Sequence, residues 1–351
     1  RMTSHAGERA PRVCSRRAFL RSLALLPLAA SLPACAGGLA TPGAPQELQT
    51  TTFCFDTACT LRGVMTQDVL DGVVELCRTF ERLLSRTIDG SDVGRINATA
   101  GTSVEVDPRT AELIRLALGY CRESDGLFDI TIGSVSELWD FKGGIVPDPA
   151  QIEAALPHVD YTKVQVEGNL VTLLDADARL DLGGIAKGYI ADALIAQLRE
   201  AGVTSAFVNL GGNVMVMGGR PDGSPWTIGV QDPATDAGEG IVAEVSRSDA
   251  SVVTSGLYER CFERAGITYW HILDPRTGYP VRGDVVGATI LSERSLDGDG
   301  LTKPLFMLPV PDALAYLEYH GVQGLLVTGG GDIRTTGASD FGLVGSRTRN
   351  E

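Results

Sequence analysis

Asp181-Leu-Gly-Gly-Ile-Ala-Lys-Gly188 is the stretch that decides the fold of this 351-residue chain. The apolar residues before it, its paired glycines and the helical spacing after it predict a strand end, a tight turn and a helix over residues 185–200. The first N–H groups of that helix are expected at Gly184 and Ile185, where the helix dipole favours an anion, and Lys187 can reach the same anion. A corner that simply needs glycine remains the structural alternative.

Three further segments of the same character follow downstream. They are Asn209-Leu-Gly-Gly-Asn213, Thr254-Ser-Gly-Leu-Tyr-Glu-Arg260 and His271-Ile-Leu-Asp-Pro-Arg-Thr-Gly278. Each places backbone N–H groups beside a charged or titratable residue, and a diphosphate site needs many such donors at close approach. A β-bulge explains the Asn209 segment equally well. Together the four segments predict one diphosphate pocket.

His271 is the candidate base of that pocket. Beyond the first 35 residues the only other histidines are His158 and His320, which are predicted to lie on the surface. His271 instead belongs to a predicted strand over residues 268–273 that runs into a rigid turn. A structural histidine is the alternative, and the nearby charged pair Glu259-Arg260 favours a functional one.

The elements around these segments predict an α+β fold and not a doubly wound parallel sheet. Helices are expected over 67–84, over 108–124 with Asp107 as N-cap, and over 312–319, and a hairpin over 164–182 that turns at 167–169. The remaining predicted strands are 51–62, 205–209, 213–218, 226–230, 241–246, 251–254, 284–291 and 324–328.

Net charge excludes one class of partner. The chain carries a formal charge of −14, and without its first 34 residues, which hold six Arg and one Glu, the charge is −19. Such an acidic body repels phosphate backbones, which argues against nucleic-acid partners. An anionic ligand must therefore be held by local donors and a cation.

The N-terminus predicts export. Ser15-Arg-Arg-Ala-Phe-Leu20 is a twin-arginine pattern, and an apolar run from Leu23 to Leu32 follows it. Leu32-Pro-Ala-Cys35 resembles a lipobox, so residues 1–35 are predicted to be a lipoprotein signal with Cys35 lipidated, at the outer face of the cytoplasmic membrane or another periplasm-facing membrane. A plain cleaved signal is the alternative. Residues 36–50 are predicted to be a flexible tether, and residues 51–345 the folded domain.

The other cysteines are predicted to be buried small hydrophobes. Beyond Cys35 they are Cys54, Cys59, Cys77, Cys121 and Cys261, an odd number without metal-ligand spacing. Cys54 and Cys59 are expected on opposite faces of one strand, so they should not pair.

In combination these segments resemble the ApbE family of flavin transferases, from about residue 51 to residue 330. The resemblance implies an ApbE-like, T-fold-related α+β architecture with mixed or antiparallel sheets flanked by helices. Besides the four segments it rests on Phe55-Asp-Thr57, Glu81-Arg-Leu-Leu-Ser-Arg-Thr87, Ser91-Asp-Val-Gly-Arg-Ile-Asn97, Ser124-Asp-Gly-Leu-Phe-Asp-Ile-Thr131 and Leu138-Trp-Asp-Phe141.

The resemblance also implies a chemistry. Such enzymes bind FAD with Mg²⁺ and move FMN onto a Thr or Ser hydroxyl of another exported protein, releasing AMP; the acceptor motif is Ser/Thr-Gly-Ala-Thr/Ser in a redox protein. By the same resemblance His271 is the base near the acceptor hydroxyl. The implied FAD contacts are Asp181, Lys187, Glu259 and Asn97.

The implied metal site departs from the family pattern. Gly184, through its carbonyl, Asp299 and Thr302 are the implied Mg²⁺ ligands, but Lys303 stands where the family has a ligand threonine. An ammonium 4 Å from Mg²⁺ is repelled by roughly 8 kcal/mol at an effective dielectric constant near 20. Lys303 could swing away, replace the metal at the diphosphate or impair turnover, and Asp297 could supply a substitute oxygen. FAD hydrolysis to FMN and AMP, or FAD binding without catalysis, are the alternative functions.

Overall fold

The computed structural model describes residues 12–13, 44–235 and 240–344. The twin-arginine pattern and Cys35 lie outside the described residues, as do positions 36–43 of the predicted tether. Within the described part, no helix is both long and apolar enough to cross a bilayer.

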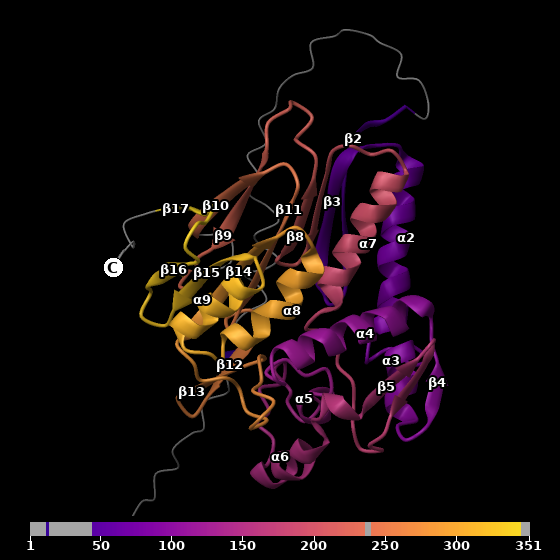
Figure 1. Ribbon diagram of the computed structural model, residues 1–351, viewed down its shortest axis with the longest axis vertical. Helices are drawn as coiled ribbons and strands as arrows, with labels where there is room; N and C mark the ends of the chain where they lie inside the picture. Colours follow the sequence, from indigo (N-terminus) through magenta and orange to yellow (C-terminus); the bar gives the residue numbers. More distant parts are fainter. Residues whose placement is uncertain (1–11, 14–43, 236–239, 345–351) are drawn as a thin grey trace, which may run out of the picture.

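An eight-stranded, wholly antiparallel sheet forms the centre of the molecule (Figure 1). Its strand order is β16-β15-β14-β11-β8-β7-β3-β2. In chain order these strands are β2 (Gln46–Cys54), β3 (Thr57–Met65), β7 (Ala206–Leu210), β8 (Asn213–Met217), β11 (Ala250–Gly256), β14 (Val285–Ser292), β15 (Gln323–Thr328) and β16 (Ile333–Thr335). The predicted α+β class with antiparallel pairing is confirmed.

Both faces of this sheet are covered. Helices α2 (Gln67–Leu84), α7 (Ala186–Glu200), α8 (Ser295–Leu305) and α9 (Val310–Tyr319) lie along one face (Figure 1). A smaller sheet of β9 (Trp226–Gln231), β10 (Ile241–Arg247) and β17 (Gly342–Leu343) packs on the other. Central strand β8 shows the consequence, because its alternate side chains enter the two cores and all five of its residues are buried.

A second group of short elements adjoins the lower end of α2 and α7 in Figure 1. It contains α3 (Asp92–Ala98), β4 (Ser103–Glu105), α4 (Pro108–Glu123), α5 (Gly133–Ser136), α6 (Pro149–Ala155), β5 (Val164–Glu167) and β6 (Leu170–Leu173), with two 3₁₀ turns, η2 (Leu156–His158) and η3 (Tyr161–Lys163). The predicted cap of α4 is confirmed, since the Asp107 side chain accepts a hydrogen bond from the Arg109 N–H. A third small sheet joins β1 (Arg12–Val13), β12 (Cys261–Arg264) and β13 (Ile267–Trp270).

Several predicted boundaries are wrong. The hairpin predicted over 164–182 ends at Leu173, so no strand leads into Asp181. The single strand over 51–62 is a hairpin, β2 and β3, which turns at Phe55 and Asp56 with φ values of 57° and 58°. Residues 46–50, assigned to the tether, are the first half of β2. The predicted strand over 268–273 ends at Trp270, so His271 follows β13 instead of lying within it.

Helix α8 was not expected from the sequence. It contains Gly298, Gly300 and Pro304, all poor helix formers in a helix interior. Both glycines are in close contact with neighbours: a Cβ on Gly298 would lie 2.4 Å from Val253 Cγ2, and one on Gly300 would lie 2.6 Å from Tyr120 Cδ1. Tertiary packing therefore places this helix against strand β11 and helix α4 where local propensity does not favour it.

The cysteines largely follow the prediction. Cys54, Cys59, Cys77 and Cys121 are buried free thiols, and Cys54 does not pair with Cys59, although the two lie on different strands of the hairpin. Burial raises the pKa of Cys59 and Cys77 to about 12, so both remain protonated. The prediction for Cys261 was wrong, because its thiol is not free but part of a disulfide.

Candidate active site

The first three glycine-rich segments meet at the start of α7. Lys187 Nζ donates to the Gly211 carbonyl at 3.1 Å, and the Thr254 N–H donates to the Gly212 carbonyl at 3.0 Å. Gly211 has a φ of +68°, and a Cβ there would lie 2.3 Å from Thr57 Oγ1. Only glycine suits that position, since both the backbone conformation and the contact exclude a side chain.

A side chain from helix α8 caps the N-terminus of α7. Ile185, the N-cap residue, offers no side-chain acceptor. Asp299 supplies one from α8, where its Oδ2 accepts from the Gly188 N–H at 2.6 Å and its carboxylate is buried. Asp299 therefore balances the positive end of the α7 dipole and holds the two helices together.

Lys303 lies beside the Gly183-Gly184 turn. Its Cε is 3.6 Å from the position that a Cβ on Gly184 would take. The ammonium donates to Thr302 Oγ1 at 3.2 Å and to Ser255 Oγ at 3.4 Å. Among the ion pairs of the described residues, none includes Lys303 or Lys187. The ammonium of Lys303 beside this turn and that of Lys187 at Gly211 therefore have only neutral acceptors in contact.

Glu259 belongs to the same charge cluster. Its Oε1 accepts from the Gly256 N–H at 3.2 Å. The residue is exposed, and the protein around its carboxyl raises the pKa of that group by desolvation, while the positive charges of Lys187 and Lys303 oppose the shift. Desolvation likewise lowers the pKa of Lys303, against the opposing charges of Asp299 and Glu259.

His271 adds a neutral imidazole to the cluster. Its backbone N–H donates to the Arg260 carbonyl at 3.0 Å, which ties it to the segment that carries Glu259. Nδ1 is buried without a hydrogen-bond partner. Desolvation, followed by the positive charges of Arg260 and Lys303, lowers the pKa of His271 to about 3. At neutral pH the imidazole is therefore uncharged and able to accept a proton.

The turn after His271 is held from a distant part of the chain. The Gly278 N–H donates to the Asp274 carbonyl at 2.8 Å, and Trp139 Nε1 donates to the Gly278 carbonyl at 3.1 Å. Trp139 comes from the Leu138–Phe141 motif, which the sequence singled out without a physical role. Its contact with Gly278 gives that motif a positioning role for the turn next to His271.

Asp181 and Asn97 occupy different places relative to the cluster. Asp181 accepts from the Gly183 N–H at 2.8 Å and from Ser136 Oγ at 3.2 Å, and its Oδ2 lies 3.3 Å from Arg86 Nε. The buried amide of Asn97 exchanges both of its hydrogen bonds with the backbone of Leu180, at 2.7 and 2.9 Å. Asn97 therefore positions the residue before Asp181, and this geometry does not favour the predicted direct contact with FAD.

The predicted Mg²⁺ ligands do come together, but the set does not fit the metal. Asp299 Oδ2 already accepts from Gly188, and the Thr302 hydroxyl donates to the Asp299 carbonyl at 3.1 Å. The same hydroxyl oxygen accepts from the Lys303 ammonium, whose carbon chain borders Gly184. Mg²⁺ requires a shell of oxygen ligands, and a fixed ammonium among them repels it.

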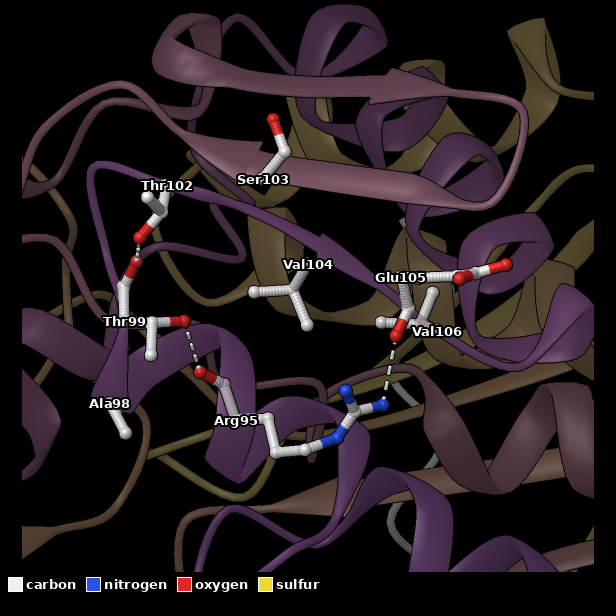
Figure 2. Close-up of a pocket in the computed structure, with 8 residues that line it drawn as sticks. All are labelled: Arg95, Ala98, Thr99, Thr102, Ser103, Val104, Glu105 and Val106. Atoms are coloured by element: carbon white, nitrogen blue, oxygen red, sulfur yellow. Dashed lines mark hydrogen bonds between the residues drawn. The ribbon is translucent and has the colours of Figure 1, made fainter.

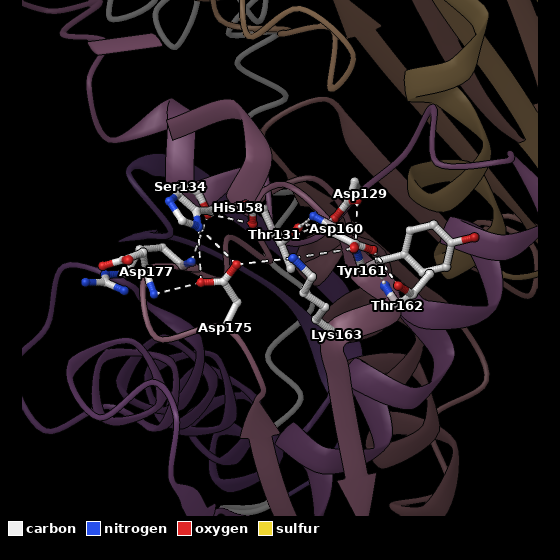
Figure 3. A network of polar contacts seen from close by, with 11 residues as sticks. Asp129, Thr131, Ser134, His158, Asp160, Tyr161, Thr162, Lys163, Asp175 and Asp177 are labelled. Carbon is white, nitrogen blue, oxygen red and sulfur yellow. Dashed lines mark hydrogen bonds and ion pairs between the residues drawn. The ribbon is translucent and has the colours of Figure 1, made fainter. Parts of the chain in front are cut away.

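A second polar cluster lies away from these residues. His158 Nδ1 is 3.1 and 3.0 Å from the two oxygens of Asp175, and Lys163 Nζ is 3.3 Å from Asp175 Oδ2 (Figure 3). With Asp177 this is the one group of metal-ligating side chains that the described residues bring together. His158 and His320 were predicted to be surface residues, and the structure corrects both: the side chain of His158 is half-buried against Asp175, and that of His320 is only 14% exposed.

Helix α3 and strand β4 border an open depression of about 760 Å³ (Figure 2). Arg95, one of its lining residues, forms an ion pair with Asp92 at 2.5 Å and donates to the Glu105 carbonyl at 3.0 Å. None of the four glycine-rich segments lines this depression, so it does not compete with the cluster around Lys187 and His271.

Known proteins are similar to this chain in sequence and in architecture. Residues 55–323 match the model of the ApbE family. An FAD:protein FMN transferase of Treponema pallidum is 36% identical over 277 residues, 74% of this chain and 76% of the relative. One of Klebsiella pneumoniae is 39% identical over 267 residues, 74% of this chain and 82% of the relative.

Solved structures agree. An ApbE protein from Thermotoga maritima superimposes with a TM-score of 0.77 at 31% identity and covers 83% of this chain and 97% of its own. The apo form of the flavinyl transferase ApbE from Pseudomonas stutzeri gives a TM-score of 0.72 at 28% identity, over 83% and 94% of the two chains.

Proposed function

Because this chain belongs to the ApbE family of flavin transferases, we propose that it moves the FMN half of FAD onto a Thr or Ser hydroxyl of an acceptor protein and releases AMP. The observation that carries this proposal is a cluster of three groups: Lys303 borders Gly184, Lys187 contacts Gly211, and the charges of both lysines lower the pKa of His271. Two cations without carboxylate partners suit a diphosphate, and a neutral imidazole within reach of their charge suits proton removal from a hydroxyl.

The reaction is a phosphoryl transfer. The acceptor oxygen forms a bond to the flavin-side phosphorus while the bond from that phosphorus to the bridging oxygen breaks, so AMP leaves with the bridging oxygen. His271 takes the proton of the attacking hydroxyl. Its low pKa in the free protein follows from burial and from the charges of Arg260 and Lys303. An anionic diphosphate among those charges raises that pKa toward neutrality, where the imidazole is a more effective base.

Two other residues have proposed roles in binding. Glu259, held by the Gly256 N–H, presents a carboxylate that can accept hydrogen bonds from FAD hydroxyl or base N–H groups. Asp181 does the same from the opposite end of the glycine turn, where Ser136 and Arg86 fix its orientation. Asn97 supports this end of the site through Leu180.

The acceptor and the location are also proposals. An exported redox protein that carries a Ser/Thr-Gly-Ala-Thr/Ser motif is the proposed acceptor. The twin-arginine pattern and the lipobox-like Leu32-Pro-Ala-Cys35 support export and lipid anchoring through Cys35 on a periplasm-facing membrane surface. Mg²⁺ remains a proposed cofactor of the reaction as a whole, although Gly184, Asp299 and Thr302 do not fit it while Lys303 lies among them.

Incubation of the purified protein with FAD and a Ser-Gly-Ala-Thr acceptor peptide tests the function. The expected products are AMP and a peptide whose mass has increased by one esterified FMN. Free FMN with unmodified peptide would instead identify an FAD pyrophosphatase, and unchanged FAD would identify a binding protein. A peptide with alanine in place of the final threonine is the matched control, because it lacks the attacking oxygen.

A further inference from the structure

We infer that the Lys303 ammonium is the resident cation of the diphosphate site, in the position where related enzymes are expected to hold a divalent metal. This inference rests on the proposed function and deepens it, because it assigns the charge that neutralises the FAD diphosphate to a side chain of the chain itself. It concerns how the ligand is bound and does not depend on which nucleophile attacks it.

The position of Lys303 is the first argument. Its ammonium is in contact with the hydroxyls of Thr302 and Ser255, and its Cε borders the Gly184 backbone. Thr302 and Gly184, together with Asp299, are the residues from which the sequence predicted a metal shell. The ammonium therefore contacts one of these implied ligands, and its carbon chain lies against another.

The surroundings of Lys303 hold it there. Helix α8 fixes its backbone through the close contacts of Gly298 with Val253 and of Gly300 with Tyr120. Asp299, one helical turn earlier, is fixed in turn by the Gly188 N–H of α7. The side chain is shielded from most solvent and does not extend to the surface as an ordinary lysine does. A swing away from the turn would require it to leave both hydroxyls.

No carboxylate of the described residues forms a direct ion pair with Lys303. Neither Asp299 nor Glu259 is within ion-pair distance of it, although both carboxylates stabilise the ammonium from further away. Its two contacts are neutral hydroxyls, which leaves one of its three N–H donors for another acceptor. Lys187, from the first turn of α7, likewise has no direct ion pair and contacts one carbonyl. Two ammonium groups without carboxylate partners, one beside Gly184 and one at Gly211, match the charge of a diphosphate.

The consequence is that FAD binding should not need a divalent cation at this position. FAD affinity, measured by isothermal titration calorimetry at constant ionic strength, should agree within about threefold between buffers with Mg²⁺ and with EDTA. Because Lys303→Met removes one charge-assisted contact, this variant should bind FAD about 10- to 100-fold more weakly in both buffers. Lys303→Thr restores an oxygen ligand, so it should bind weakly in EDTA and regain at least tenfold in Mg²⁺.

Lys163→Met is the matched control, because it removes an ammonium from the distant Asp175 cluster and should leave FAD affinity unchanged in both buffers. A wild-type affinity that falls tenfold or more in EDTA contradicts the inference and leaves the proposed function intact. Equal affinities of wild type and Lys303→Met also contradict it. Absence of FAD binding by the wild type in both buffers would overturn the proposed function, and this inference with it.

Discussion

His158 and His271 both lie among charged side chains, but their surroundings differ in a way that separates structure from function. His158 has its Nδ1 against both oxygens of Asp175, which also receives Lys163, so these three side chains satisfy one another (Figure 3). His271 has a buried Nδ1 without a partner, and the lysines whose charges lower its pKa contact only neutral oxygens. Buried polar groups are usually satisfied, but five other buried side-chain atoms of the described residues also lack a partner, so Nδ1 indicates a ligand site only in combination with the two lysines.

The two clusters also shift pKa values for different reasons. The hydrogen bond from His158 lowers the pKa of Asp175 to about 2, because the interaction favours the charged carboxylate. Desolvation lowers the pKa of His271 to about 3, because burial disfavours the charged imidazole. The first shift reflects stabilisation by contacts already made, and the second reflects the loss of water around a group that has gained no partner in exchange.

Substitution of the two histidines should give the largest contrast. His271→Gln should slow FMN transfer by about 100- to 10,000-fold, the usual contribution of a positioned general base, with little change in melting temperature. His158→Gln should leave the transfer rate within about threefold and lower the melting temperature, since it breaks the pair with Asp175. Initial rates and thermal melts of both variants check this. Similar rate losses in the two variants would remove the distinction between the clusters.

The acid side of the pH profile gives the next largest effect. kcat/KM reports the free protein, in which His271 stays neutral until the pH falls toward about 3. The profile should therefore be flat between pH 8 and pH 5. A histidine with an ordinary pKa near 6.5 would lose about 30-fold over the same interval. A descending limb centred near pH 6.5 would show that His271 is not desolvated in the free protein.

The candidate active site also contains a carboxylate, Asp299, whose hydrogen bond from the Gly188 N–H is already made, and its contribution to stability can be measured. Asp299→Ala removes the cap of α7 and should lower the free energy of unfolding by about 1–2 kcal/mol. Asp312→Ala, at an exposed position in the first turn of α9, is the control and should cost about 0.5 kcal/mol or less. Chemical denaturation at neutral pH measures both. Equal losses would mean that the bond from Gly188 to Asp299 contributes little.

The smallest expected effect concerns acid stability. The folded-state pKa of Asp175, about 2, is lower than its unfolded value near 4, so its contribution is present above about pH 4 and is lost as the pH falls through 2. Asp175→Asn should therefore cost about 1 kcal/mol or less at pH 7 and only about a fifth of that at pH 2. Denaturant titrations at the two pH values check this. A cost as large at pH 2 as at pH 7 would indicate that packing, not charge, holds His158.

The regular elements with strong periodicity were predictable from local sequence. Helix α2 begins at Gln67 and ends at Leu84 as predicted, because its apolar positions repeat at helical spacing over its whole length. Helix α8 was missed because Gly298, Gly300 and Pro304 obscure that signal and its stability comes from contacts with other elements. The β2–β3 turn was missed because Phe55 and Asp56 adopt positive φ without the glycine that usually indicates it.

The sequence by itself determined the chemical groups of this protein: two lysines, a histidine, the carboxylates and the glycine turns that allow backbone donors to approach a ligand. Those properties belong to residue types and short motifs, so they can be read locally. Tertiary structure alone decided that Lys303 borders Gly184, although they lie far apart in the chain, and that His271 is neutral. Both facts depend on packing and desolvation, which arise from the whole fold and not from neighbouring residues.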